Sequence, residues 1–362
     1  MQRLAALLLL TLSLASGSAT AQTGLDTSSL ERFWQVYEML QTDREPSDRT
    51  WDSLWATPGY ALLETRERRR AALTRAMRLA FRPSLSAEKV AALRENNWLA
   101  RAVAHMSRIP EHRDTLSRFV ASLDRRAMDR GAALAQRYLP PETVSRAPIP
   151  NMSLVYFLDA RGYQERLLID PLYFLELPNP IEVMAHEFHH YYRSTLPLLH
   201  RSYGSDLLAW VLSTVESEGI PGLLDKAEVP ALSSEAIRGR YRDPAQQKYY
   251  LDYRIEYNER SNHRLRQAER VLEVIAAHPD SATTLGPWLH RELPDNGRIL
   301  GAFMAAAIER QLGRDALNRT VGDPAAFWRL YGEAASRDAS LPQGLSPLAL
   351  RTLAVLDSTY RR

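Results

Sequence analysis

The sequence predicts a mainly helical protein with one small β-sheet, an α+β fold. Apolar residues recur at helical spacing over most of the 362 residues, and β-type sequence is confined to one short region near the middle of the chain. Because 45% of the residues are hydrophobic and 25% are charged, the chain is expected to bury a sizeable core.

Residues 1–21 differ from the rest and are expected to be a signal peptide. Arg3 supplies a positive charge, Leu4 to Leu12 form an apolar segment, and Ala19-Thr20-Ala21 is a cleavage site of the A-x-A type. The apolar segment is too short to cross about 30 Å of hydrocarbon. We therefore expect cleavage after Ala21, no membrane span in the mature chain, and a periplasmic or secreted protein.

Residues 22–150 are expected to form a helical N-terminal lobe. Helical patterns run from Leu30 to about Tyr138. They include an Ala-, Leu- and Arg-rich stretch from Tyr60 to Leu79 and a long amphipathic run from His112 to Leu139. The stretch from Ala147 to Pro150 then indicates a linker.

A β-type region follows directly. Ser153 to Leu158 and Arg166 to Ile169 are rich in apolar and β-forming residues, and the segment from Asp159 to Gly162 between them has the composition of a turn. We predict two paired strands here.

Residues 151–362 are expected to form a second domain that contains these strands and several helices. The first helix is predicted to begin at Pro180, because Asn179 suits the N-cap position and Glu182 suits the first turn. Further helices are predicted over about Asp206 to Glu218, Asp243 to Ala277, Gly297 to Leu312, Ala325 to Ala335 and Pro347 to Leu356.

The composition excludes several kinds of site. The chain has no cysteine, which excludes disulfide frameworks, thiolate zinc sites, iron–sulfur clusters and cysteine nucleophiles. Any metal ion must therefore be held by His, Asp or Glu. The net charge of +3 is small for this length, and no nucleic-acid partner is expected.

The helix predicted to begin at residue 180 contains His186-Glu187-Phe188-His189-His190, an H-E-x-x-H motif. Residues four apart lie one turn above each other on a helix, so His186 and His190 can bind one metal ion, with Glu187 beside it. The apolar residues of the helix lie on the opposite face, which is expected to pack. His189 lies well off the direction of the pair, so we expect it to pack or to support the site from outside the ligand set, and not to bind metal.

A catalytic zinc ion needs a third protein ligand, and Glu216 and Glu218 are the next candidates. Because they are two residues apart on a predicted helix, they point in different directions. Glu218 falls within the arc of apolar residues, whereas Glu216 points away from it. A buried carboxylate is costly unless it is paired or bound to a cation, so we predict Glu218 as the ligand. Gly219 directly after it suits a helix end.

With these residues the sequence resembles the gluzincin group of zinc metallopeptidases, which carry a strand, an H-E-x-x-H helix and a later Glu-Gly. More narrowly, it resembles a bacterial family of uncharacterised zinc-dependent peptidases. The segments that carry this resemblance are Trp51 to Tyr60, Ile169-Asp170, His186 to His190, Glu218-Gly219-Ile220, Gly301 to Ala305, Ile308-Glu309 and Leu312-Gly313.

The resemblance implies that residues 151–362 form a zincin-like catalytic domain with one Zn²⁺ per chain. The zinc ion would be held by His186, His190 and Glu218. Glu187 would act as general base and then as general acid in the hydrolysis of a peptide or protein substrate.

The resemblance also bears on the surroundings of the site. Related sequences commonly carry an acid shortly after the Glu-Gly, where this chain has Pro221 and Gly222, and Asp225 is a candidate to replace it. An extended peptide could pair with the edge of the strand at Ser153 to Leu158 or of that at Arg166 to Ile169.

The group that stabilises the oxyanion is left open. Tyr250, Tyr253 and Tyr257 share a helix face that is expected to be mainly core, and His263 and Arg298 are further candidates. Two other functions stay open as well. One is a zinc hydrolase of non-peptide amides, and the other is a catalytically inactive periplasmic helical protein that binds or scaffolds a partner.

Overall fold

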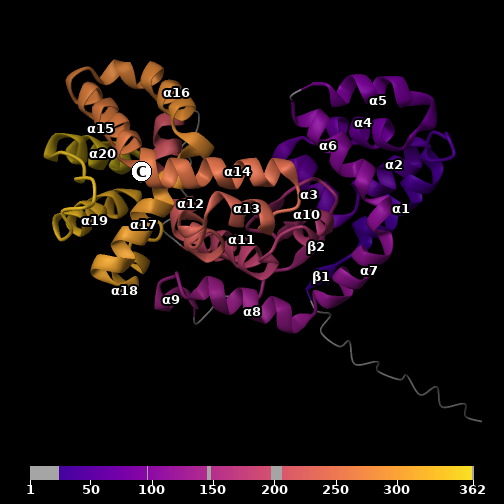
Figure 1. Ribbon diagram of the computed structural model, residues 1–362, viewed down its shortest axis with the longest axis horizontal. Coiled ribbons are helices and arrows are strands. Elements are labelled where there is room, and N and C mark those ends of the chain that lie inside the picture. The colour runs from indigo at the N-terminus through magenta and orange to yellow at the C-terminus, as the bar shows by residue number, and fades with distance from the viewer. Residues whose placement is uncertain (1–23, 96, 145–147, 197–205, 361–362) are drawn as a thin grey trace, which may run out of the picture.

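The fold is that of a computed structural model (Figure 1), which describes residues 24–95, 97–144, 148–196 and 206–360. It is mainly helical (74%) with one small four-stranded mixed sheet, which confirms the predicted fold class. The predicted signal peptide, residues 1–21, lies outside the described residues. No helix in the described part of the chain combines the length and apolarity needed to cross a membrane.

The N-terminal part consists of a short strand and a series of helices. These are β1 (Leu25–Asp26), α1 (Ser28–Leu40), α2 (Asp48–Trp55), α3 (Pro58–Glu67), α4 (Arg70–Phe81), α5 (Ser86–Leu93), α6 (Trp98–Arg108), α7 (Arg113–Ser122), α8 (Arg125–Gln136) and α9 (Pro141–Val144).

The remainder of the chain adds three strands and further helices. These are β2 (Met152–Leu154), β3 (Ala160–Gly162), β4 (Leu167–Ile169), α10 (Pro171–Leu175), α11 (Pro180–Ser194), α12 (Leu207–Asp225), α13 (Ser234–Arg240), α14 (Pro244–Ile255), α15 (Ser261–Ala277), α16 (Ala282–Glu292), α17 (Arg298–Leu312), α18 (Arg314–Asn318), α19 (Pro324–Ser336) and α20 (Pro347–Tyr360).

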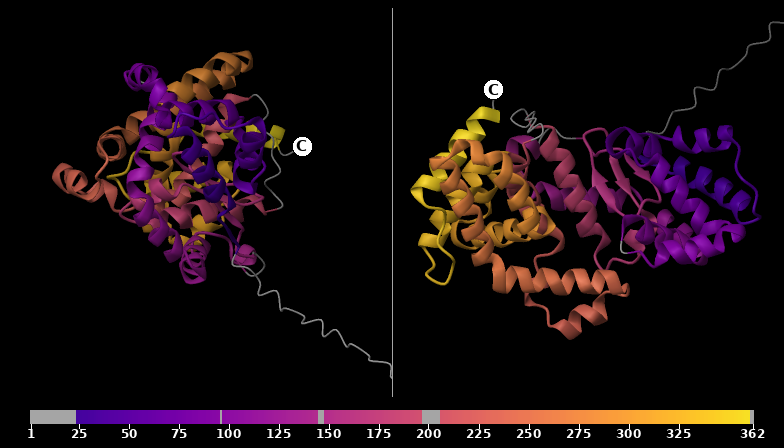
Figure 2. Two further views of the ribbon diagram at one scale, coloured as in Figure 1. Left: turned by 90° about the vertical axis from the view of Figure 1, so that its right-hand side faces the viewer. Right: turned by 90° about the horizontal axis from the view of Figure 1, so that it is seen from above.

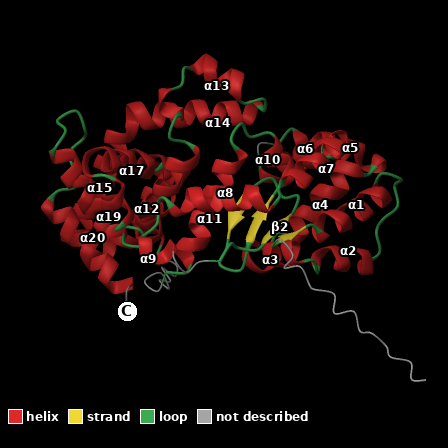
Figure 3. Ribbon diagram, turned by 90° about the horizontal axis from the view of Figure 1, so that it is seen from below, coloured by secondary structure: helices red, strands yellow, loops and turns green. Residues whose placement is uncertain are grey.

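The sheet has the strand order β1-β2-β4-β3. β1 pairs with β2 and β2 pairs with β4 in parallel, whereas β3 pairs with β4 in antiparallel orientation. All residues of β2 and β4 are buried, and the sheet lies between the N-terminal helices and the C-terminal helices (Figure 3).

The predicted pairing of the two strands is confirmed, since β2 pairs with β4, in parallel. The segment predicted as a turn between them contains β3 instead. The strand β2 is also shorter than predicted, because the N–H groups of Phe157 and Leu158 donate to the carboxylate of Asp170, at 2.7 Å each, and not to a neighbouring strand. Since β2 and β4 are internal, neither can receive a peptide by edge pairing; the edges of this sheet are β1 and β3.

The largest buried cluster draws on both parts of the chain. It extends from Leu30 in α1 to Leu353 in α20 and includes the sheet, α11, α12 and α17. α11 packs against α8, where a Cβ atom added at Gly131 would lie 2.9 Å from the ring of Phe188. The helix with the H-E-x-x-H motif is therefore supported by the N-terminal part.

α12 is longer than predicted. It runs through Pro221 to Asp225 and does not end near Gly219. The reason is a close contact with α17, since a Cβ atom added at Gly219 would lie only 2.3 Å from the backbone of Gly301. Gly219 is therefore a packing residue in mid-helix, because only a residue without a side chain lets the two backbones approach so closely.

Two long helices of the prediction are broken in the structure. The run from His112 to Leu139 forms α7 and α8, since Asp124 caps α8 by accepting the N–H of Ala127 at 2.9 Å. The run from Asp243 to Ala277 forms α14 and α15, separated by a π-helical turn over Glu256–Arg260. Together with α13, α14 projects from the body of the molecule (Figure 2, right).

Candidate metal centre

α11 presents both outer histidines of the motif on one face. His186 and His190 are one helical turn apart, with their ring centroids 4.9 Å from each other. The opposite face of the helix is held by packing, since Phe188 and Tyr192 are fully buried. The packing therefore fixes the direction in which both imidazole rings point.

The start of α11 is tied to the end of α12. Asn179 occupies the N-cap position, as predicted, but its side chain does not cap the helix. Instead, its Nδ2 donates to the backbone carbonyl of Asp225 at 2.8 Å. This bond holds the histidine-bearing helix against the helix that carries Glu218.

Glu218 of α12 faces both histidines. Its Oε2 lies 3.4 Å from Nε2 of His186 and 3.4 Å from Nε2 of His190, and one ligand atom of each residue lies within 4.8 Å of the others. Ligands at about 2.1 Å from a tetrahedral zinc ion are separated by about 3.4 Å. Oε2 is also buried, and the groups around it are the two imidazole rings and the guanidinium of Arg298, whose Nε lies 3.0 Å away without the geometry of a hydrogen bond. The donor set fits zinc.

The argument that selected Glu218 over Glu216 from burial is wrong. Glu216 is the more buried of the two, with no exposed side-chain surface. It forms an ion pair with Arg193 and accepts the N–H of Gly322 at 3.0 Å. α12 is buried on nearly all sides, so an arc of apolar residues does not separate an inner from an outer face. Both glutamates face an arginine, but only Glu218 also faces two histidines.

Asp225, at the last position of α12, orients the first histidine. Nδ1 of His186 donates to Oδ1 of Asp225 at 3.1 Å, which leaves Nε2 directed at Glu218. Burial lowers the pKa of His186, but Asp225 and Glu218 outweigh it and raise this pKa to about 9. Asp225 thus occupies the position of the carboxylate that the residues directly after Gly219 do not supply.

Arg298, the first residue of α17, completes the charged cluster. Its Nε lies 3.0 Å from Oε2 of Glu218. Burial raises the pKa of Glu218, but His190 and Arg298 outweigh it and hold this pKa well below its usual range. Glu218 is therefore a carboxylate anion, as a metal ligand must be.

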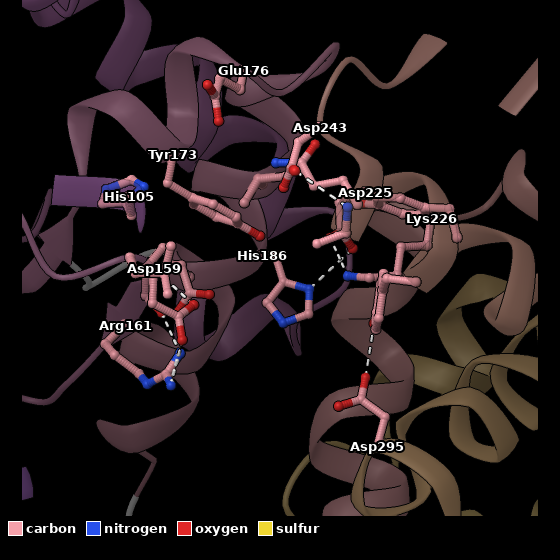
Figure 4. A pocket seen from close by; sticks show the side chains of 18 of the residues that line it. His105, Asp159, Arg161, Tyr173, Glu176, His186, Asp225, Lys226, Asp243 and Asp295 are labelled. Carbon is pink, nitrogen blue, oxygen red and sulfur yellow. Dashed lines mark hydrogen bonds and ion pairs between the residues drawn. The ribbon is translucent and has the colours of Figure 1, made fainter. Parts of the chain in front are cut away.

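These residues line a cavity of about 650 Å³. Its walls come from α6, β3, α10, α11, α12, the N-terminal half of α14 and the start of α17. Figure 4 shows His186 facing Asp225, with Tyr173 and the pair Asp159 and Arg161 on the neighbouring wall. Glu187 also lines the cavity and forms no ion pair with any residue that the structure describes.

The edge strand β3 lies directly on the motif. A Cβ atom added at Gly162 would lie 2.3 Å from the backbone carbonyl of Glu187 and 3.0 Å from Cβ of His190. Ala160, Arg161 and Gly162 all line the cavity. The strand missed by the sequence prediction therefore forms one wall of the site, and only glycine allows it to approach α11 so closely.

The sequence analysis also missed a buried histidine from the N-terminal part. His105 of α6 lines the cavity, and its Nε2 lies 2.7 Å from Oδ2 of Asp170. Asp170 is completely buried and in addition accepts N–H groups from the loop before β3 and from the first turn of α10. The sequence did give a signal for Asp170, because an Asp followed by Pro, as in Asp170-Pro171, is typical of a helix start. Nothing in the sequence indicated His105.

The remaining candidates from the sequence lie in the core, in the cavity wall or on the surface. His189 is fully buried and donates to the carbonyl of Tyr138 at 3.0 Å, which confirms that it packs. Tyr253 is buried in a small hydrophobic cluster, as expected, and Tyr250 belongs to this cluster but also lines the cavity. His263 is exposed on α15 and does not line the cavity.

Comparison with known proteins supplies one match. A family model described as "Putative zinc dependent peptidase (DUF5700)" matches residues 51–340. This range covers all the residues of the centre described above. No curated protein and no solved structure matches the chain.

Proposed function

The chain belongs to the DUF5700 family of putative zinc-dependent peptidases, and we propose that it is a metallopeptidase of the gluzincin type. The observation that carries this proposal is the convergence of Nε2 of His186, Nε2 of His190 and Oε2 of Glu218 at the separation expected for tetrahedral zinc ligands. These three residues would hold one Zn²⁺ per chain and leave one position open, as catalytic zinc sites do.

The mechanism assigns a role to each neighbouring side chain. A zinc ion at this site supplies a Lewis acid for the scissile carbonyl and lowers the pKa of water toward about 7. Glu187 takes the proton of the attacking water as general base and delivers it to the leaving amine as general acid. Asp225 keeps Nδ1 of His186 protonated and the ring in its orientation.

Arg298 is the proposed stabiliser of the oxyanion. Of the candidates left open by the sequence, it is the one with a permanent positive charge in the cavity. Its guanidinium already lies next to Glu218, so it can face negative charge that develops on the carbonyl oxygen beside the site. An arginine would then do what a neutral hydroxyl does in many hydrolases.

The proposed path of the substrate follows β3. This strand is at the edge of the sheet, lines the cavity and contacts Glu187 through Gly162. A peptide in extended conformation can add to such an edge through main-chain hydrogen bonds, which would place a peptide bond next to the general base.

Export remains a proposal that rests on residues 1–21 and their A-x-A site. We propose a periplasmic or secreted peptidase. Cell fractionation followed by N-terminal sequencing checks this, with Gln22 expected as the first residue. Recovery of the full-length chain from the cytosol would contradict it.

A digest with a peptide library tests the function. Zinc-loaded protein is expected to contain one zinc per chain and to cleave peptides, to lose cleavage on treatment with a chelator, and to regain it with zinc. The same preparations are assayed on cell-wall amides. Cleavage of those amides without any peptide cleavage would favour the non-peptide hydrolase, and absence of bound zinc would favour a binding or scaffold protein.

A further inference from the structure

A side pocket of about 140 Å³ opens next to the main cavity. The two share Arg101, Leu158, Asp159 and Arg161 in their walls. The part of its wall that is not shared is partly apolar and contains Leu73, Trp98 and Phe157. Since about 15 Å³ of such volume holds one water molecule, the side pocket has room for a side chain of several non-hydrogen atoms.

The acidic groups of this pocket are already neutralised. Glu67 contacts Nε of Arg69 at 3.0 Å and Nε of Arg161 at 3.2 Å, and it accepts a hydrogen bond from Tyr163. Asp159 contacts Arg161 at 2.6 Å. Two arginines and two carboxylates thus balance each other within the wall.

The wall of the side pocket contains a third arginine, which is not paired with these carboxylates. Arg101 of α6 lines both the side pocket and the main cavity, and its exposed side chain forms no hydrogen bond or ion pair with any described residue. On the same helix, Arg108 is paired with Glu176. Across the main cavity, Asp225 is paired with Lys226, and Asp295 accepts a hydrogen bond from Tyr249. The wall of the side pocket therefore contains three arginines against two carboxylates, and Arg101 is the arginine whose side chain is not paired with either of them. The main cavity beside it also contains the acids Glu187 and Asp243.

The side pocket lies within a few residues of Glu187 along β3. Asp159 and Arg161 flank the first residue of β3, and Gly162 contacts Glu187. A strand rises about 3.3 Å per residue, so a peptide paired with β3 would place a side chain at the pocket roughly two residues from the bond at Glu187.

We propose that this side pocket is a specificity site for a carboxylate, and that Arg101 binds an acidic side chain of the peptide substrate close to the scissile bond. The proposal deepens the proposed peptidase function and rests on it. Arginine binds carboxylates through two parallel N–H groups, so the selection is expected for Glu and Asp and not for neutral isosteres.

The test compares peptides that carry Glu, Gln or Lys at each position near the cleaved bond. Zinc-loaded wild type is expected to cleave the best Glu peptide with a kcat/KM about 10-fold or more above that of its Gln and Lys counterparts. Arg101→Glu should reverse this order in favour of Lys, and Arg101→Gln should remove it. Arg126→Glu on α8 makes the same charge change at an exposed position outside both pockets and should keep the wild-type preference.

Further measurements separate the possible outcomes. Zinc content and thermal unfolding show whether each variant is folded, and binding of the same peptides to Glu187→Gln protein measures selection without hydrolysis. Cleavage by wild type without preference for acid, or an unchanged preference in Arg101→Glu, would overturn the inference alone. A preference that disappears when the peptide carboxyl terminus is amidated would also overturn it, since a terminal carboxylate is then the ligand. Failure to cleave any peptide would overturn the proposed function and this inference together.

Discussion

Glu216 and Glu218 are two residues apart on α12, and their partners give them different tasks. Glu216 is completely buried and Glu218 is slightly exposed, so greater burial does not identify the metal ligand. Glu216 neutralises Arg193 and holds the backbone of Gly322, whereas Glu218 faces the Nε2 atoms of two histidines. At the scale of single residues, the two imidazole nitrogens beside Glu218 distinguish it from Glu216, because both carboxylates have an arginine partner.

A pair of matched substitutions checks this difference. Glu218→Gln is expected to weaken zinc binding by more than about 100-fold. Loss of a residue that only hydrogen-bonds to a metal ligand already costs about 10- to 100-fold in metal affinity. Glu216→Gln should leave zinc affinity nearly unchanged but lower the free energy of unfolding by about 3–5 kcal/mol, since it leaves Arg193 buried without its partner. Zinc titration and urea unfolding measure the two effects. The assignment fails if Glu216→Gln is the variant that loses zinc.

Asp225 provides a second prediction at this scale. Asp225→Asn is expected to weaken zinc binding by about 10- to 100-fold, because the amide no longer favours the Nδ1–H form of His186. Competition with a zinc chelator measures this affinity. An affinity equal to that of wild type would show that the contact with His186 does not support metal binding.

At the scale of elements, the crossing of α12 and α17 positions both Glu218 and Arg298. A Cβ atom added at Gly301 would lie 1.9 Å from the backbone carbonyl of Val215, so the contact is backbone against backbone. The sequence analysis quoted Gly219 and Gly301 but interpreted Gly219 as a helix end. The pairing of two glycines 82 positions apart cannot be deduced from local patterns, because each glycine is compatible with a cap, a turn or a close contact.

Gly301→Ala tests the role of this crossing. The added methyl group must push α12 and α17 apart, so the free energy of unfolding should fall by about 1–3 kcal/mol or more, and zinc affinity should fall with it. Gly239→Ala in α13 is the control, since nothing lies within 4 Å of the added Cβ and alanine favours a helix. Thermal unfolding and zinc titration measure both. Equal stability of Gly301→Ala and wild type would contradict the packing described here.

The strands show what local patterns can and cannot predict. The apolar runs that became β2 and β4 were recognisable from composition. The parallel direction of their pairing and the strand β3 between them in sequence were not recognisable. The early end of β2 was not either, since the N–H groups of Phe157 and Leu158 donate to Asp170, which lies 12 to 13 residues away. The start of α11 was placed well from Pro180 at its first position, although the side chain of Asn179 does not cap it, whereas the π-helical turn after α14 has no sequence signal.

At the scale of the whole molecule, the candidate site is assembled from both parts of the chain. Only the H-E-x-x-H motif is local, and it was therefore predictable. His105 is 65 residues from its partner Asp170, and Asp225 is 39 residues from His186, so neither contact has a sequence pattern. The division at residue 150 stays a prediction, which limited proteolysis checks: a preferred cut near residue 150 is expected, with both fragments held together by the shared core.

The buried tyrosines of this shared core predict instability at high pH. Tyr60 is fully buried, and its hydroxyl donates to the carbonyl of Tyr156 at 3.2 Å. Burial, with smaller effects of Asp170 and Tyr156, raises the pKa of Tyr60 well above 10. Since the folded pKa exceeds the unfolded one, this contribution to stability is complete below about pH 10 and is lost as the pH rises further.

Tyr60→Phe isolates this effect. Between about pH 10 and pH 11, the free energy of unfolding of wild type should fall by about 1 kcal/mol more than that of the variant. Near neutral pH the variant should be less stable by about 1 kcal/mol, because one hydrogen bond is lost. Urea unfolding at a series of pH values measures both, and parallel pH curves for the two proteins would contradict the prediction.

The central claim is tested most directly by peptide cleavage and zinc content of Glu187→Gln, measured beside wild type and beside Glu182→Gln on the same helix. The account predicts that all three proteins bind one zinc per chain, that Glu182→Gln cleaves peptides like wild type, and that Glu187→Gln loses cleavage by about 100- to 10,000-fold. Cleavage by zinc-loaded Glu187→Gln at the wild-type rate would contradict the account.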